Sequence, residues 1–190
     1  MALMLRKQIK WVSWFCMISI VAVPVFAQEV ALSNITVSNT SDDLLLYLNL
    51  EGAFNEKVKK AILSGVPATF YFLAKLDRVR DIWVDSSIAD IKVTHSIKYD
   101  NLKKEFVVRR SWRDNEPEVT KSFSEAQTWM TEVNSLKIVP LSKLEKGQQY
   151  QLRTKAEVSK QTLPLYLHYV LFFVSIWDIK TDWYTIDFIF

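Results

Sequence analysis

The chain has 190 residues, with 24 lysines and arginines against 21 aspartates and glutamates. Arg6, Lys7 and Lys10 account for the whole excess of positive charge. The remainder is close to neutral and lacks the basic field typical of nucleic-acid-binding proteins. Cys16 is the sole cysteine, which excludes a disulfide framework. Removal of the N-terminal segment would leave no cysteine, which also excludes a thiolate nucleophile and a cysteine-ligated metal.

The N-terminal residues have the three parts of a secretory signal peptide. A basic start is followed by an uncharged run from Trp11 to Phe26, and Ala27 offers a small residue for cleavage before Gln28. The uncharged run is shorter than the roughly 20 apolar residues that a membrane-spanning helix needs. The sequence therefore predicts cleavage between Ala27 and Gln28.

This cleavage would leave residues 28–190 as a single domain after a signal peptide of residues 1–27. A chain of this length is enough for one hydrophobic core and too short to expect two. We expect the domain to be exported to the periplasm of a Gram-negative bacterium. The alternative is that residues 11–27 stay uncleaved and anchor the protein in the inner membrane.

Alternating apolar and polar residues predict β-strands along most of the domain. Residues 90–99 and 105–110 alternate on either side of a turn at 100–101, which is typical of a hairpin. Residues 149–158 alternate equally clearly. Leu44–Leu50 and Phe70–Leu76 are apolar enough to be central strands that are covered on both faces.

Two amphipathic helices interrupt these strands. Gly52 and Gly65 bracket residues 53–64, and Gly65 stands where a helix commonly ends. The second helix opens with a capping box of Ser122 and Glu125. Its apolar stripe consists of Ala126, Trp129, Met130 and Val133. Each helix should cover a sheet with one face and meet solvent with the other.

These elements predict an α+β fold. We expect about eight strands, mainly antiparallel, in a β-sandwich or strongly curled sheet with two covering helices. The order of elements lacks the strand–helix alternation that parallel sheets need.

The residue types that carry common catalytic and metal chemistry are sparse. His95 lies on the apolar face of its predicted strand, where a hydrogen-bonded core histidine is the expected reading, and His168 lies among apolar residues. Thr94 and Ser96 flank His95, but neighbouring strand residues point to opposite faces and do not form a catalytic triad. We therefore expect no enzyme activity, no metal and no cofactor.

Arginine and tryptophan side chains form the most suggestive candidate surface. These side chains are enriched at the energetic centres of protein interfaces. We hypothesise that a predicted hairpin brings two such segments together to bind a protein partner. The candidate residues are Arg78, Arg80, Trp83, Arg109, Arg110 and Arg113. The alternative is that the tryptophans are core residues on which arginine stems pack.

The C-terminal part of the chain is rich in aromatic residues. Residues 163–177 carry no charge. Farther along the chain, every second residue from 184 to 190 is apolar or aromatic: Tyr184, Ile186, Phe188 and Phe190. We expect a buried sheet strand here. A strip that contacts a membrane surface or docks a partner is the alternative.

The chain resembles the DUF4390 family of exported bacterial proteins. The similarity is one of pattern over nearly the whole predicted domain. The residues that carry it are Ser64–Pro67 with the apolar strand that follows, Asp77–Asp85, His95–Asp100, Arg110–Trp112 and Leu163–Tyr184.

This resemblance implies a bacterial envelope protein and implies no activity. Genes of relatives often lie beside genes for membrane sensor histidine kinases of the nitrogen-regulation type, so it implies such a kinase as the protein partner. We expect a non-catalytic envelope domain that binds a protein. The alternative is a periplasmic module that binds an apolar ligand or lipid.

Overall fold

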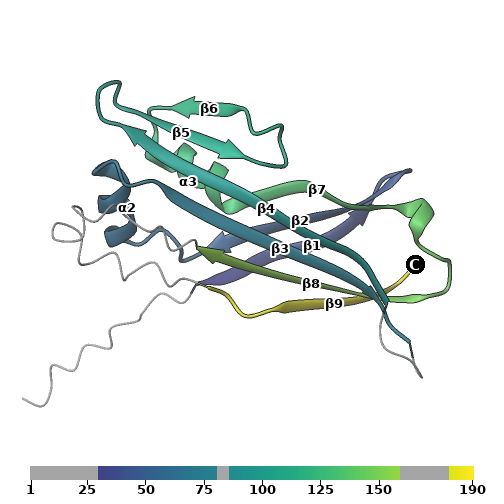
Figure 1. The fold of residues 1–190 in the computed structure, drawn as a ribbon. Coiled ribbons are helices and arrows are strands. Elements are labelled where there is room, and N and C mark those ends of the chain that lie inside the picture. The colour runs from purple at the N-terminus through teal and green to yellow at the C-terminus, as the bar shows by residue number, and fades with distance from the viewer. Residues whose placement is uncertain (1–29, 81–85, 159–179) are drawn as a thin grey trace, which may run out of the picture.

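The computed structural model of the chain describes residues 30–80, 86–158 and 180–190. This part of the chain forms nine strands and two helices (Figure 1). The elements before the second helix are β1 (Ala31–Asn39), β2 (Asp43–Glu51), α2 (Glu56–Leu63), β3 (Ala68–Arg78), β4 (Ser86–Asp100), β5 (Glu105–Arg110) and β6 (Pro117–Thr120). They are followed by α3 (Phe123–Thr131), β7 (Glu132–Pro140), the short 3-10 turn η1 (Leu141–Lys143), β8 (Gln149–Val158) and β9 (Tyr184–Ile189).

The strands form two antiparallel sheets, which confirms the predicted α+β fold. The smaller sheet has the order β1-β2-β7, and the larger one has the order β6-β5-β4-β3-β8-β9. The extra strand relative to our estimate is β6, whose four residues begin with Pro117 and show no apolar alternation to reveal them. Non-consecutive neighbours such as β3 and β8 show that the larger sheet is assembled by long-range pairing.

The structure confirms the hairpin between β4 and β5 that the alternating residues predict. Val93, His95 and Ile97 of β4 are buried, as are Phe106 and Val108 of β5. Opposite residues of the two strands pair in register, with Ile97 facing Val108. One face of this hairpin therefore contributes to the core.

Both helices begin with local side-chain caps. Asn55 accepts hydrogen bonds from the backbone N–H groups of Lys57 and Val58, so α2 begins at Glu56 and not at residue 53. Gly65, with φ of +88°, follows its end as predicted. Ser122 accepts the N–H of Glu125 at 3.3 Å, which confirms the predicted start of α3.

The predicted apolar stripe of α3 needs correction. Ala126 and Met130 are buried, but Trp129 is only half-buried. Val133 is buried as a residue of β7, because the helix already ends at Thr131.

The core lies between the two sheets, with both helices on the inner face of the larger one. Phe54 contacts Phe70 of β3 and Phe123 of α3, with ring centroids 5.3 and 5.9 Å apart. Phe123 also meets Phe106 of β5 at 5.6 Å. The aromatic rings join the helices to the sheet at this end of the core.

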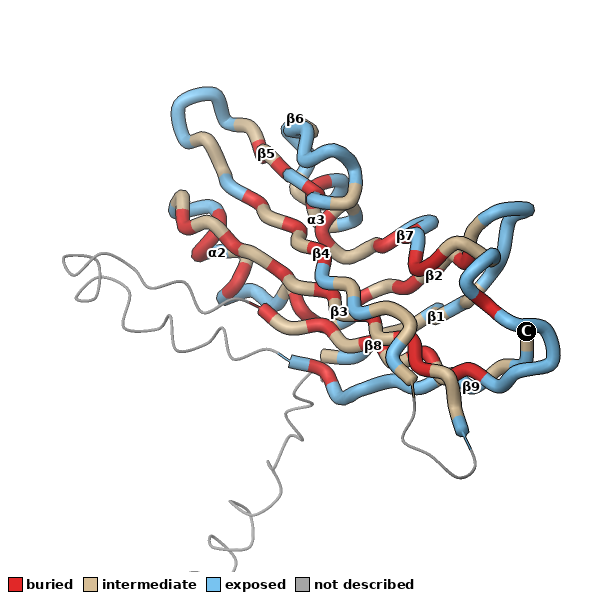
Figure 2. Tube along the Cα trace, turned by 45° about the vertical axis from the view of Figure 1, so that its right-hand side comes forward, coloured by how far each residue is buried: buried red, intermediate tan, exposed pale blue. Residues whose placement is uncertain are grey.

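Strands β2 and β3 are central in their sheets, as predicted, but neither is buried on both faces. Along β3, Phe70 and Phe72 are buried while Tyr71 and Leu73 between them are only half-buried. Figure 2 shows this alternation, and it also shows that β9 is largely exposed. The tail therefore ends in a sheet strand, but at the edge and not in the core, while residues 163–177 lie outside the described part.

Candidate partner-binding site

The predicted arginine residues fall at two separate places on the larger sheet. Arg78 ends β3 and pairs with Ser86 of β4, whereas Arg110 pairs with His95 of the same strand. Nine residues of extended strand separate these positions, which is about 30 Å at 3.3 Å per residue. The expectation that the hairpin brings the two segments together is therefore wrong. Trp83 lies outside the described residues.

Most of these arginines already have partners within the chain. Arg78 forms an ion pair with Glu145 at 2.5 Å, and Arg109 donates a hydrogen bond to the carbonyl oxygen of Asn115 at 3.1 Å. Arg80 is exposed just beyond β3. A role of either arginine group in binding a partner stays a prediction.

Arg110 belongs to the buried side of β5. Its side chain is 6% exposed, and its Nη2 atom lies 2.6 and 2.5 Å from the two carboxylate oxygens of Glu118 on β6. Arg113 lies 3.7 Å from the same carboxylate. The two guanidinium groups lie 5.9 and 5.6 Å from the ring of Trp112. These contacts join β5 to β6 at one corner of the larger sheet.

His95 completes the buried cluster as a neutral core histidine, which confirms its expected reading. The indole N–H of Trp112 donates to Nε2 at 2.8 Å, and Nδ1 lies 3.1 Å from the carbonyl oxygen of Met130. Because an indole N–H only donates, Nε2 is the acceptor and Nδ1 carries the proton. Burial, reinforced by the positive charge of Arg110, lowers the pKa of His95 from 6.5 to about 4.

The edges of the two sheets differ in how they are protected. β1 has a register shift between Ser33 and Thr36, and β7 has an irregular register against β2. β6 has only four residues and starts with Pro117. Bulges, prolines and short length are the devices that keep edge strands from pairing with other chains.

β9 has none of these devices. Its six residues pair with β8 in unbroken register from Tyr184 to Ile189, without a proline. In the sheet formed by the described residues nothing pairs with its outer edge. Phe188 stacks on Tyr150 at 5.8 Å and holds the strand in place.

The outer edge of β9 carries unpaired backbone groups beside apolar side chains. Phe190 donates its N–H to the carbonyl oxygen of Gln148, and hydrogen-bonded positions alternate in antiparallel pairs. The backbone groups of Thr185, Asp187 and Ile189 therefore face away from β8. Six large apolar side chains are exposed in the described part of the chain, and three of them are on or beside β9: Trp183, Tyr184 and Ile189.

A family model described as "Domain of unknown function (DUF4390)" matches residues 27–187. The chain belongs to the DUF4390 family. The match covers most of the chain and confirms the resemblance seen in the sequence. No curated protein and no solved structure matches the chain.

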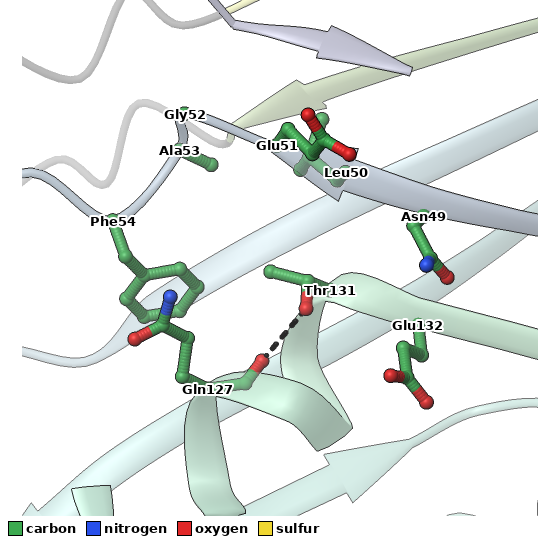
Figure 3. A pocket seen from close by; sticks show the side chains of 9 residues that line it. All are labelled: Asn49, Leu50, Glu51, Gly52, Ala53, Phe54, Gln127, Thr131 and Glu132. Atoms are coloured by element: carbon green, nitrogen blue, oxygen red, sulfur yellow. Dashed lines mark hydrogen bonds between the residues drawn. The ribbon is translucent and has the colours of Figure 1, made fainter. Parts of the chain in front are cut away.

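Binding of an apolar ligand or lipid would need an enclosed apolar cavity, and two surface depressions of this DUF4390 domain can be compared with that requirement. The first, of about 390 Å³, lies between the end of β2 and the end of α3 (Figure 3). Polar side chains such as Glu51, Gln127 and Glu132 line it, and Thr131 donates a hydrogen bond back to the carbonyl of Gln127 at 3.0 Å.

The second depression, of about 400 Å³, lies between the start of β3 and the β4–β5 hairpin, with Lys98, Asp100 and Arg109 on its wall. Both are open to solvent and partly polar. Neither has the enclosed apolar lining that a lipid-binding pocket needs.

Neither a bilayer-spanning helix nor a metal-binding cluster is found within residues 30–80, 86–158 and 180–190. No helix there is long and apolar enough to cross a membrane. Over the same residues, no three His, Cys, Asp or Glu side chains gather as metal ligands would.

Sequence reasoning did not single out β9 as the site. The alternation of residues 184–190 predicts a strand, but an edge strand and an inner strand share that pattern. The pairing order of the whole sheet decides which strand is at the edge.

Proposed function

We propose that the domain is an exported, non-catalytic binding domain of the bacterial envelope that recognises a protein partner by strand addition at β9. The observation that carries this proposal is the regular edge of β9 beside Trp183, Tyr184 and Ile189, with which no further strand of the described residues pairs. The occupant is an extended segment of the partner protein. It adds as the next strand of the larger sheet.

Strand addition obtains affinity from backbone hydrogen bonds and specificity from side chains beside the edge. Thr185, Asp187 and Ile189 offer the outward backbone groups. Ile189 is 76% exposed and Tyr184 is 48% exposed, so both have apolar surface to bury against an incoming strand. A polypeptide satisfies both requirements, whereas a small apolar ligand satisfies only the second.

The position of the domain in the chain supports export. The family match begins at residue 27 and β1 begins at Ala31, so the basic and uncharged N-terminal segment precedes the domain. We place the domain in the periplasm, with retention of residues 11–27 in the inner membrane as the alternative. The resemblance to DUF4390 relatives favours a membrane sensor histidine kinase as the partner.

The environment of His95 supports a non-catalytic role. Its ring is fully buried, and both nitrogens are engaged by Trp112 and Met130. Thr94 and Ser96 beside it lie on the opposite face of the strand. Because both ring nitrogens are engaged, neither is available to activate a nucleophile.

Site-specific photo-crosslinking in the native host tests the proposal. A photoreactive residue at Ile189 should crosslink to an envelope protein, whereas one at Val119 on the short β6 edge should not. Thr185→Pro removes an outward N–H without removing a β8–β9 hydrogen bond, so it should abolish the crosslink. Thr185→Ala is the matched control and should retain it. Crosslinks that persist in Thr185→Pro, or that are equally strong from Val119, would refute strand addition at β9.

A further inference from the structure

One end of the molecule combines exposed lysines with exposed leucines. The residues come from α2 and from the β4–β5 loop, residues 101–104, and all of them are exposed. Leu102 at the loop tip is 96% exposed, and Leu63 at the end of α2 is 39% exposed. We call this surface the lysine end, and it consists of Lys57, Lys60, Leu63, Leu102, Lys103 and Lys104.

The two elements form one continuous surface. α2 leads directly into β3, whose first residue Ala68 pairs with Ile97, close to the loop. A Cβ atom at Gly65 would lie 2.9 Å from the side-chain nitrogen of Asn101, which places the end of α2 against the loop. Figure 1 shows α2 and this loop at the same end of the larger sheet.

The loop is held in a defined shape. The carboxylate of Asp100 accepts the N–H groups of Leu102 and Lys103 at 2.9 and 3.0 Å. Lys104 donates its N–H to the carbonyl oxygen of Asp100 at 2.8 Å and adopts a φ of +58°. Leu102 is therefore presented at the tip of an ordered turn.

Among the residues that the structure describes, the lysines of the lysine end form no salt bridge. Elsewhere in the described part of the chain, seven bases are paired with carboxylates: Lys75, Arg78, Arg110, Arg113, Lys137, Arg153 and Lys155. The four lysines of the lysine end take part in none of these pairs. Glu56 of α2 and Asp100 at the start of the loop lie in the same two elements, and Asp100 interacts electrostatically with Lys103. The four lysines outnumber these two carboxylates, so this end is positive although the domain is close to neutral as a whole.

The start of β1 and the end of β8 lie at the same end of the fold as α2 (Figure 1). β1 starts at Ala31, which pairs with Glu51 just before α2. β8 ends at Val158, and the chain returns at Lys180, which bridges to Glu157.

We propose that the lysine end docks on the surface of an anionic phospholipid bilayer. The ammonium groups lie at the lipid phosphates, and Leu63 and Leu102 enter the boundary between headgroups and acyl chains. Lysine suits this role because it is a compact point charge that needs no fixed geometry of its partner. The strands then stand away from the bilayer, and the β9 edge stays accessible from the side.

Vesicle co-sedimentation of the protein recovered from the cell envelope tests this proposal. Vesicles of phosphatidylcholine and phosphatidylglycerol in equal parts should bind it more tightly than phosphatidylcholine alone, and added salt should weaken the binding. Lys57→Gln with Lys60→Gln should lower the partition coefficient by about fivefold for each lysine removed. Lys143→Gln with Lys146→Gln makes the same charge change at the opposite end and should leave binding nearly unchanged.

A fluorescence measurement keeps the proposal testable if the lysine variant misfolds. A polarity-sensitive dye on Leu102→Cys, in a Cys16→Ser background, should shift to the blue on anionic vesicles. The same dye on Lys143→Cys should not shift. Equal binding to both kinds of vesicle, equal losses in the two lysine pairs, or an unchanged dye at position 102 would overturn the proposal. None of these variants alters β9, so the outcome is independent of strand addition.

Discussion

Acidification should destabilise the domain through His95. The pKa of this histidine in the native state is about 4, because burial disfavours the charged ring, whereas its ordinary value is 6.5. Between these two values the unfolded chain binds a proton that the native protein does not bind. The stability that the neutral His95 ring contributes to the native state is therefore fully present above pH 6.5 and is lost as the pH falls toward 4.

The two pKa values set the size of this effect. The lowering of the pKa from 6.5 to about 4 corresponds to roughly 3 kcal/mol of unfolding free energy at full extent, and most of it is already lost at pH 4.5. Protonation also breaks the contact with Trp112, because Nε2 then carries a hydrogen and faces the donor N–H of the indole.

Urea unfolding at pH 7 and at pH 4.5 measures the loss, with His95→Gln as the reference. The variant should be less stable than the parent at pH 7, but its further loss of unfolding free energy on acidification should be smaller by about 2–3 kcal/mol. The parent and the variant differ only at position 95, so the contributions of all other groups cancel in the comparison.

Trp112→Phe gives a second measurement if His95→Gln does not fold. It removes the hydrogen bond that favours the neutral ring, so the pKa of His95 should rise and the pH dependence should weaken. Parallel pH profiles for the parent and both variants would refute the assignment of His95 as a buried neutral histidine.

Three further predictions concern processing, the core and the buried ion pair. The intact mass of the protein recovered from the envelope should match residues 28–190, and recovery of the full-length chain only in detergent would identify an anchor instead. Met130→Ala should cost about 2–5 kcal/mol in urea unfolding because its side chain is fully buried, and Trp129→Ala should cost less because its ring is half-buried. Arg110→Gln should cost about 1–3 kcal/mol by leaving the Glu118 carboxylate without its buried partner, whereas Arg113→Gln should change the unfolding free energy by less than about 0.5 kcal/mol. Equal costs within either pair of variants would contradict the observed burial.

Local features of the fold could be predicted because they depend on neighbouring residues. Period-two alternation predicts β4 and β5 with the correct inward face, including the burial of His95. Gly65 and Ser122 mark a helix end and a helix start through backbone geometry and capping that act within a few residues. β6 was not predicted because its four residues, which begin with a proline, are too few to show an alternation of apolar and polar residues.

The candidate binding sites depended on which strands meet, and the sequence alone does not determine this. Arg78 and Arg110 lie on strands that both neighbour β4, yet the pairing register places them about 30 Å apart. Tyr184–Ile189 reads as an ordinary strand until the pairing order places it at an edge. The lysine end likewise requires α2 and the β4–β5 loop to lie together.

By itself, the sequence determined the alternation of the longer strands, the caps of the helices and the near-neutral charge of the domain. The tertiary structure decided which strand edge is open, which arginines are buried and which lysines gather at one end. The physical reason is that alternation and capping are set by residues adjacent in the chain. Strand order and register are set by the shared burial of segments far apart in sequence, such as Phe70 of β3 opposite Val158 of β8.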